Sequence, residues 1–162
     1  MDGSLWGLKN FGQNGVKEDS DIEAELAWNI TTGNPNVVIA ILDTGIDLDH
    51  PDLASELVAG YDFVDNDTNA NDGNMHGTAC ASIAAGRTNN SIGVSGICWD
   101  CSMMPVKVLG DGGSGDYDDN INGVVCASDN GSQVLSKSLW GGGYVGSLDN
   151  SIDYAKSKVT IV

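Results

Sequence analysis

The feature that most constrains the fold is a short apolar segment, residues 37–42, that ends on an aspartate. The segment reads Val-Val-Ile-Ala-Ile-Leu, and Asp43-Thr44-Gly45 follows it directly. Its β-branched residues do not alternate with polar ones, which is typical of a strand buried on both faces of a parallel sheet. In such sheets, functional side chains gather beyond the carboxyl ends of the strands, which is where Asp43 stands.

Predicted strands and helices alternate along the rest of the chain. Apolar runs predict further strands at residues 56–64, 103–109, 134–139 and 159–162. Helical spacing predicts helices at residues 21–30, 76–85, 117–130 and 147–158. This alternation is typical of an α/β fold, a mostly parallel sheet flanked by helices on both faces. We expect one domain over residues 1–162, with about residues 1–20 as a surface arm.

The composition excludes several classes of partner. With 23 acidic residues against 7 basic ones, the net charge is −16, which disfavours binding to nucleic acid or to an anionic membrane. No segment approaches the roughly 18 apolar residues of a membrane span. The first residues, Met-Asp-Gly-Ser-Leu-Trp, have neither the basic nor the apolar region of a signal peptide. We therefore expect either a cytosolic protein or one with a targeting segment further upstream.

A second informative segment, residues 74–86, places a histidine before a run of small residues. His76 is followed by Gly-Thr-Ala-Cys-Ala-Ser-Ile-Ala-Ala-Gly, which predicts a helix that can pack closely. Triad chemistry needs a buried carboxylate that orients an imidazole, which in turn takes the proton of a serine hydroxyl. Asp43 suits the first role and His76 the second. Either residue alone would be interpreted as an ordinary turn or loop residue, but together they favour catalysis.

Two other interpretations fit the chain less well. Asp-Thr-Gly also occurs at the catalytic aspartate of pepsin-like proteases, but those proteins are largely β and need a second such carboxylate. The sequence has no second Asp-Thr-Gly. His50 is the only other histidine, and because it precedes Pro51 we expect it to be extended and structural.

Together, the two segments resemble the aspartate and histidine signatures of the subtilisin-like serine proteases, the subtilases. Leu5-Trp-Gly-Leu8 is similar to the start of the mature enzymes, and His50-Pro-Asp-Leu53 to the segment after their aspartate. The order of aspartate before histidine, with serine last, is that of subtilisin. The chain matches about the first half of the family's catalytic domain. The resemblance therefore implies serine-type endopeptidase activity and a truncated α/β sheet.

The resemblance also implies how a substrate would bind. Asp43 and His76 would be catalytic, and an extended peptide or protein substrate would lie as an added strand between two segments. Their substrate-binding residues are Gly113, Ser114, Gly115, Ser138, Leu139 and Gly141. Trp140 departs from the family, which often has glycine there, and would crowd the substrate unless the register shifts by one residue. Ala79 departs as well, because the family usually has a second histidine or a similar residue there.

Structural calcium is the cofactor that the resemblance implies, with no organic cofactor. One site would use Asp52 and Asn90 with backbone carbonyls of Ile92 and Val94. A second would use Asp62, Asp67, Asn69 and Asn71, in a loop that also contains Asp65 and Asp72. Hard oxygen ligands suit Ca²⁺. A solvated acidic loop is the alternative for this second site.

The cysteines predict no zinc site. Cys98 and Cys101 form one pair, and a structural zinc site would need a second pair that Cys80 and Cys126 do not supply. We expect a local disulfide or two buried thiols at Cys98 and Cys101. Cys80, one helical turn beyond His76, is expected to be a small core residue.

The 162 residues contain no segment that resembles the family's nucleophilic serine or its oxyanion-binding asparagine. Loss of an oxyanion donor alone lowers turnover about 10²–10³-fold. We therefore expect this chain by itself to be inactive. The alternative to a protease is a catalytically incomplete fragment that is inactive or only binds peptides. By resemblance, the complete protein is expected to be secreted and made with a pro-segment.

Overall fold

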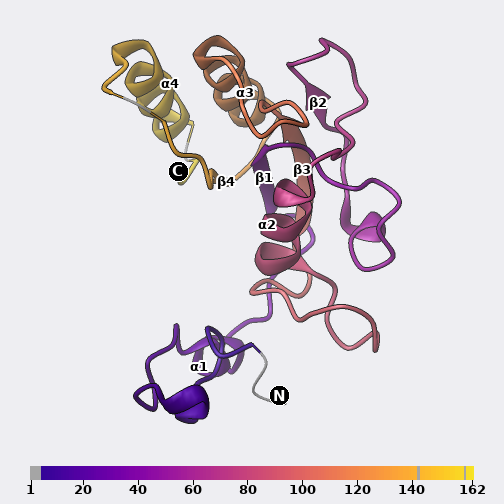
Figure 1. Cartoon of the computed structure of the whole chain (residues 1–162), viewed down its shortest axis with the longest axis vertical. Helices are drawn as coiled ribbons and strands as arrows, with labels where there is room; N and C mark the ends of the chain where they lie inside the picture. Colours follow the sequence, from indigo (N-terminus) through magenta and orange to yellow (C-terminus); the bar gives the residue numbers. More distant parts are fainter. Residues whose placement is uncertain (1–4, 142, 159) are drawn as a thin grey trace.

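The computed structural model describes residues 5–141, 143–158 and 160–162 of the chain. Four strands form the sheet: β1 (Val38–Asp43), β2 (Tyr61–Asp62), β3 (Ser102–Lys107) and β4 (Val134–Ser136). The α-helices are α1 (Ala24–Trp28), α2 (His76–Ala85), α3 (Tyr117–Asp129) and α4 (Gly146–Ser157). Two short 3₁₀ helices lie at Gln13–Gly15 and Ala54–Glu56. Figure 1 shows α2 overlapping β1 and β3 in this view, with α3 and α4 side by side.

All strands are parallel, in the order β2-β3-β1-β4. β1 is central and pairs with β3 along its whole length, from Val38 opposite Ser102 to Asp43 opposite Lys107. Its other edge pairs with β4. Both edges and both faces of β1 are therefore covered, which is the environment that its continuous apolar sequence predicts.

Alternate side chains of β1 enter two separate cores. Ala40 and Leu42 pack in one core with Val124 of α3 and Ala155 of α4. Ile39 and Ile41 pack in the other, with residues that include Ala81 and Ala85 of α2. The prediction of an α/β fold with helices on both faces of a mostly parallel sheet is thus confirmed.

Several predicted elements are shorter in the structure. The strand expected at 56–64 is reduced to β2, because the Asp62 carboxylate accepts the N–H groups of Val64 and Asp65 and closes a turn there. The strand expected at 134–139 ends at Ser136, and residues 160–162 contribute one isolated bridge, from Ile161 to Val134. Val159 lies outside the described residues. The helix expected at 21–30 covers only 24–28, since Glu23 has left-handed backbone angles.

The N-terminal segment is folded on itself around a buried asparagine. Asn10 is fully buried, and its Nδ2 donates to the carbonyls of Lys17 and Ser20. Its N–H donates to the Asp21 carboxylate. Figure 1 shows this segment with α1 at the end of the molecule away from α3 and α4. Among the described residues, no helix has both the length and the apolar character needed to cross a membrane.

A close approach of backbones fixes α2 on the carboxyl end of β1. Gly77, the second residue of α2, is buried, and a Cβ atom there would lie 2.1 Å from the carbonyl oxygen of Gly45. It would also lie 3.1 Å from Cβ of Asp43. Only glycine therefore lets the first turn of α2 rest against the turn that follows β1.

We expect Gly77→Ala to lower the free energy of unfolding by about 1–3 kcal/mol, the usual cost of overpacking, because its methyl group would meet rigid backbone. Urea denaturation measures this change. Gly112→Ala is the matched control, because a Cβ atom at Gly112 would have no neighbour within 4 Å. The control should stay within about 0.5 kcal/mol of the parent chain. Equal losses in the two variants would contradict the close approach.

Candidate active site

Asp43 and His76 meet where the carboxyl end of β1 faces the start of α2. The Nδ1 atom of His76 lies 2.7 Å from Oδ1 of Asp43. The Asp43 side chain is 1% exposed, whereas the His76 side chain is 51% exposed. The carboxylate is thus fixed in the interior, while the other edge of the imidazole remains free to contact a further group.

The Asp43 carboxylate concentrates negative charge behind the imidazole. Its Oδ1 also accepts the N–H of Thr44 at 2.8 Å. Its Oδ2 is buried and has no hydrogen-bond partner within the described ranges. The hydrogen bond to Asp43, and then the negative charge of that carboxylate, raise the pKa of His76 above its ordinary value. The pair therefore favours a protonated imidazole, as a general base requires once it has taken a proton.

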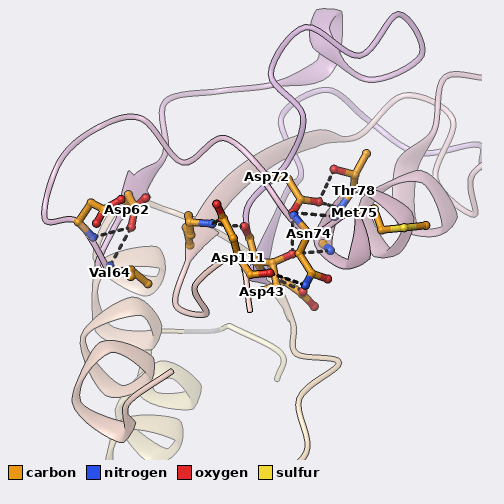
Figure 2. Close-up of polar contacts among 12 residues, drawn as sticks. Asp43, Asp62, Val64, Asp72, Asn74, Met75, Thr78 and Asp111 are labelled. Atoms are coloured by element: carbon orange, nitrogen blue, oxygen red, sulfur yellow. Dashed lines mark hydrogen bonds and ion pairs between the residues drawn. The ribbon is translucent and has the colours of Figure 1, made fainter. Parts of the chain in front are cut away.

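A second carboxylate, Asp72, holds the backbone that carries His76. Its two oxygens accept hydrogen bonds from the N–H groups of Asn74, Met75 and Thr78 and from the hydroxyls of Thr44 and Thr78. Figure 2 shows Asp72 next to Asn74, Met75 and Thr78. Met75 has left-handed backbone angles immediately before His76. These bonds fix that turn and the first turn of α2.

The bonds to Asp72 also explain its ionisation. Partial burial acts to raise the pKa of Asp72, but the hydrogen bonds from Thr78, Asn74 and Thr44 outweigh burial and lower it below its ordinary value. From its position in the sequence, Asp72 was predicted only to belong to the oxygen-rich loop of the second calcium site. Its role was missed because most of its donors are backbone N–H groups, although an aspartate a few residues before a helix is a known capping signal.

Five of the six predicted substrate-binding residues line a cavity with His76. The cavity measures about 500 Å³. The segment after β3 forms one of its walls, and the segment after β4 forms another. The predicted residues in its walls are Gly113, Ser114, Gly115, Ser138 and Leu139. The sixth, Gly141, lines an adjoining cavity instead. Trp140 also lines the His76 cavity, with 97% of the residue exposed.

Cys80 lies beside the pair but is not activated. Its Sγ atom is 3.9 Å from Nδ1 of His76. Burial, the largest effect, and the charge of Asp43 raise the pKa of the Cys80 thiol. The thiol is therefore protonated at neutral pH and is a weak nucleophile. Across the described part of the chain, Asp43, His76 and Cys80 are the sole group of three potential metal ligands of the His, Cys, Asp or Glu type.

For Cys98 and Cys101, the sequence left open a local disulfide or two buried thiols. Cys98 and Cys101 form a disulfide, with their Cα atoms 5.5 Å apart. Gly33 packs directly on this disulfide. Cys126 is a free thiol.

Asp52 and Asn90, 38 positions apart in sequence, meet in the first predicted calcium site. Asp52 is 1% exposed and accepts hydrogen bonds from Asn90 Nδ2 at 2.6 Å and from the N–H of Val94 at 3.2 Å. No cationic side chain within the described ranges forms an ion pair with it. A buried, unpaired carboxylate suits a cation. Asn90 would have to rotate its amide, since its Oδ1 now accepts the N–H of Ile92.

The second predicted calcium site is less convergent. Asp62 and Asp67 exchange backbone hydrogen bonds, and the side chains of both residues accept N–H groups within the loop. The Asp62 carboxylate accepts the N–H groups of Val64 and Asp65, and the Asp67 carboxylate accepts the N–H of Asn69. The side-chain oxygen of Asn71 accepts the N–H of Leu48. Asp67, Asn69 and Asn71 are exposed. This geometry is that of a turn stabilised by its own side chains.

Comparison with known proteins gives a consistent result. A profile of the subtilase family matches residues 34–162. Thermitase from Thermoactinomyces vulgaris is 46% identical over 143 residues, which are 87% of this chain and 50% of thermitase. The halolysin-like extracellular serine protease Nep from Natrialba magadii is 40% identical over 73% of this chain and 23% of its own length. A crystal structure of a cold-adapted subtilisin-like serine proteinase superposes with a TM-score of 0.71 and 30% identity, covering 95% of this chain and 52% of that one.

We expect Asp43→Asn to lower the pKa of His76, because the substitution removes the charge that stabilises the imidazolium. NMR titration of the His76 ring protons measures this shift. The raised pKa of His76 contributes stability that is complete below the unfolded pKa of about 6.5 and is lost as the pH rises through the folded pKa. Asp43→Asn should remove that dependence. Asp49→Asn, at an exposed position, is the control, and an equal shift in both variants would contradict a specific pair.

Proposed function

Since this chain belongs to the subtilase family, we propose that it carries the aspartate and histidine of a subtilisin-like serine endopeptidase. Such an enzyme hydrolyses peptide bonds with an Asp-His-Ser triad. The observation that supports this most is the 2.7 Å contact between a buried carboxylate and a half-exposed imidazole. The chain spans about half the length of thermitase and of the cold-adapted proteinase.

In the proposed mechanism, Asp43 accepts the Nδ1 proton of His76 in a hydrogen bond, so that Nε2 is the basic nitrogen. Nε2 takes the proton of the serine hydroxyl during attack and then donates it to the leaving amine. No serine in the described ranges forms a hydrogen bond with His76. We therefore assign the nucleophile and the oxyanion donor to no residue of this sequence and propose that the 162 residues alone do not hydrolyse peptides.

The substrate in this proposal is an extended peptide or a segment of a protein. It would bind as an added strand between residues 113–115 and 138–141, because backbone pairing to an exposed strand edge holds peptides irrespective of most side chains. The geometry that supports this is the shared cavity that places both segments beside His76. The peptide carbonyl would then lie at the carboxyl end of the sheet, beside the imidazole that deprotonates the attacking serine.

We propose an extracellular location for the complete protein. The Cys98–Cys101 disulfide suits an oxidising compartment. The relative Nep is itself described as extracellular. A pro-segment is proposed from the resemblance to the family alone.

A chimera that joins residues 1–162 to the remaining half of thermitase tests the catalytic proposal. It should hydrolyse a peptide p-nitroanilide and react with a fluorophosphonate, whereas the 162-residue chain should do neither. Asp43→Asn in the chimera should lower kcat on the order of 10⁴-fold, because an amide no longer holds the imidazole in the tautomer that leaves Nε2 basic. Asp49→Asn should leave kcat unchanged. Fluorophosphonate labelling of the 162-residue chain would show that a nucleophile lies within it, and peptide binding without turnover in the chimera would favour the non-catalytic alternative.

We further propose that Ca²⁺ binds at Asp52 and Asn90, with the carbonyls of Ile92 and Val94, and stabilises the loop without any chemical role. At a free concentration 100 times the Kd, bound Ca²⁺ should raise the free energy of unfolding by about 2.7 kcal/mol. Thermal melts with Ca²⁺ and with a chelator measure this gain. Asp52→Asn should abolish the difference and Asp49→Asn should keep it. A melt independent of Ca²⁺ would rule the site out.

A further inference from the structure

Three buried charged residues lie in one row across the sheet, with Lys107 in the middle. In the parallel register, Lys107 of β3 stands opposite Asp62 of β2 and opposite Asp43 of β1. Residues paired in this way direct their side chains to the same face of the sheet. Asp43, Asp62 and Lys107 are 1%, 2% and 4% exposed. A buried cation is therefore the neighbour, in the sheet, of the carboxylate that contacts His76.

Lys107 nevertheless forms its ion pair with a residue outside this row. Its Nζ atom donates to Oδ1 of Asp111 at 2.8 Å and to the carbonyl oxygen of Thr44 at 2.7 Å. Within the described ranges, the ion pair with Asp111 is the one that Lys107 forms. Because Thr44 directly follows Asp43, the ammonium group reaches the turn that carries the carboxylate of Asp43 without pairing with that carboxylate.

Asp111 is held in this position by the loop that leads to His76. The Nδ2 atom of Asn74 donates to the backbone carbonyl of Asp111 at 2.8 Å, and Figure 2 shows the two residues together. Gly73 leaves room for the Asp111 carboxylate, because a Cβ atom at that position would overlap it. The side chain of Asp111 is 67% exposed, whereas that of Lys107 is 5% exposed. Asp111 thus holds a buried cation from the surface of the protein.

Without Asp111, the ammonium group has an acceptor on Asp43. The Oδ2 atom of Asp43 is buried and has no hydrogen-bond partner in the part of the chain that the structure describes. Asp62 competes less well, because its Oδ1 already accepts two N–H groups. Asp72 accepts bonds from two hydroxyls and three N–H groups. Burial raises the pKa of the Cys80 thiol, so it carries no charge at neutral pH. Asp43 is therefore the carboxylate to which the ammonium group would turn.

We propose that Asp111 is a positioning residue of the catalytic pair, which binds the ammonium group of Lys107 and thereby keeps that cation away from Asp43. This inference rests on the proposed catalytic role of Asp43 and His76. An ammonium group bound to Oδ2 of Asp43 would offset the negative charge that stabilises the imidazolium. With Asp111 in place, that charge remains available to His76. Asp111 acts through Lys107 and has no part in the proton transfer itself.

The test measures the pKa of His76 in the full 162-residue chain, by NMR titration of its ring protons. Asp111→Ala removes the anion that holds Lys107, so the ammonium group should turn to Asp43 and the pKa of His76 should fall. Asp49→Ala, which deletes an exposed carboxylate of the same charge, is the matched control and should leave the pKa of His76 unchanged. Asp111→Glu keeps an anion for Lys107 and should retain the parent pKa. An equal pKa of His76 in the parent chain and in Asp111→Ala would overturn the inference.

Lys107→Met shows whether the effect passes through the lysine. In a double-mutant cycle, Asp111→Ala should lower the pKa of His76 when Lys107 is present and should not change it in the Lys107→Met background. Equal decreases in both backgrounds would mean that the charge of Asp111 acts on His76 directly, and the positioning role would be wrong.

Salt dependence keeps the test decisive if thermal melts show that Lys107→Met does not fold. Interactions with an exposed charge such as Asp111 are screened at about 1 M NaCl, where the Debye length is about 3 Å, whereas buried pairs are screened much less. If Lys107 has turned to the buried Asp43, the decrease caused by Asp111→Ala should persist at high salt. Its disappearance at high salt would identify a direct effect of the Asp111 charge and would overturn the inference.

The outcomes separate this inference from the proposal on which it rests. If Asp43→Asn lowers the pKa of His76 and Asp111→Ala does not, the catalytic pair stands and the positioning role of Asp111 is wrong. If Asp43→Asn leaves the pKa of His76 unchanged, the pair itself is wrong and the role of Asp111 falls with it.

Discussion

The hydrogen bond between Asp43 and His76 joins two elements that local sequence alone would not bring together. It connects the buried end of the central strand to the first residue of a helix on one face of the sheet. The bond exists because β1 is covered on all sides and because Gly77 permits backbone contact with Gly45. A carboxylate held this rigidly cannot move away from the ring, so the short distance between its charge and the imidazole is maintained.

Two carboxylates have different roles at this end of the sheet. Asp43 contacts the imidazole ring, whereas Asp72 contacts the backbone that carries it. Thr44 connects Asp43 with Asp72, since its N–H donates to Asp43 and its hydroxyl donates to Asp72. The same hydroxyl accepts the N–H of Gly77. The orientation of the imidazole is thus determined by a buried network, while its free edge faces a cavity lined by segments that follow two other strands. This arrangement is preorganised, which is the property that electrostatic catalysis depends on.

The sequence predicted the parts of this arrangement that rest on periodicity. β1 and α2 were located within one residue, because a doubly buried strand and a helix of small residues have distinctive patterns. The extents of β2 and β4 could not be predicted, since the apolar runs continue beyond the residues that pair with β3 and β1. Asp72 was not recognised for a different reason. It is identified by its N–H donors, which are not visible without coordinates.

The central claim, that Asp43 prepares His76 as a base at Nε2, is tested most directly by the tautomers of the two histidines. Nitrogen-15 NMR of the neutral rings distinguishes a proton on Nδ1 from one on Nε2. His50 is an internal reference, because its Nδ1 accepts the N–H of Asp52 and its proton must therefore lie on Nε2. The account predicts the opposite tautomer for His76, with the proton on Nδ1 and toward Asp43. A His76 ring protonated on Nε2, as in His50, would contradict it.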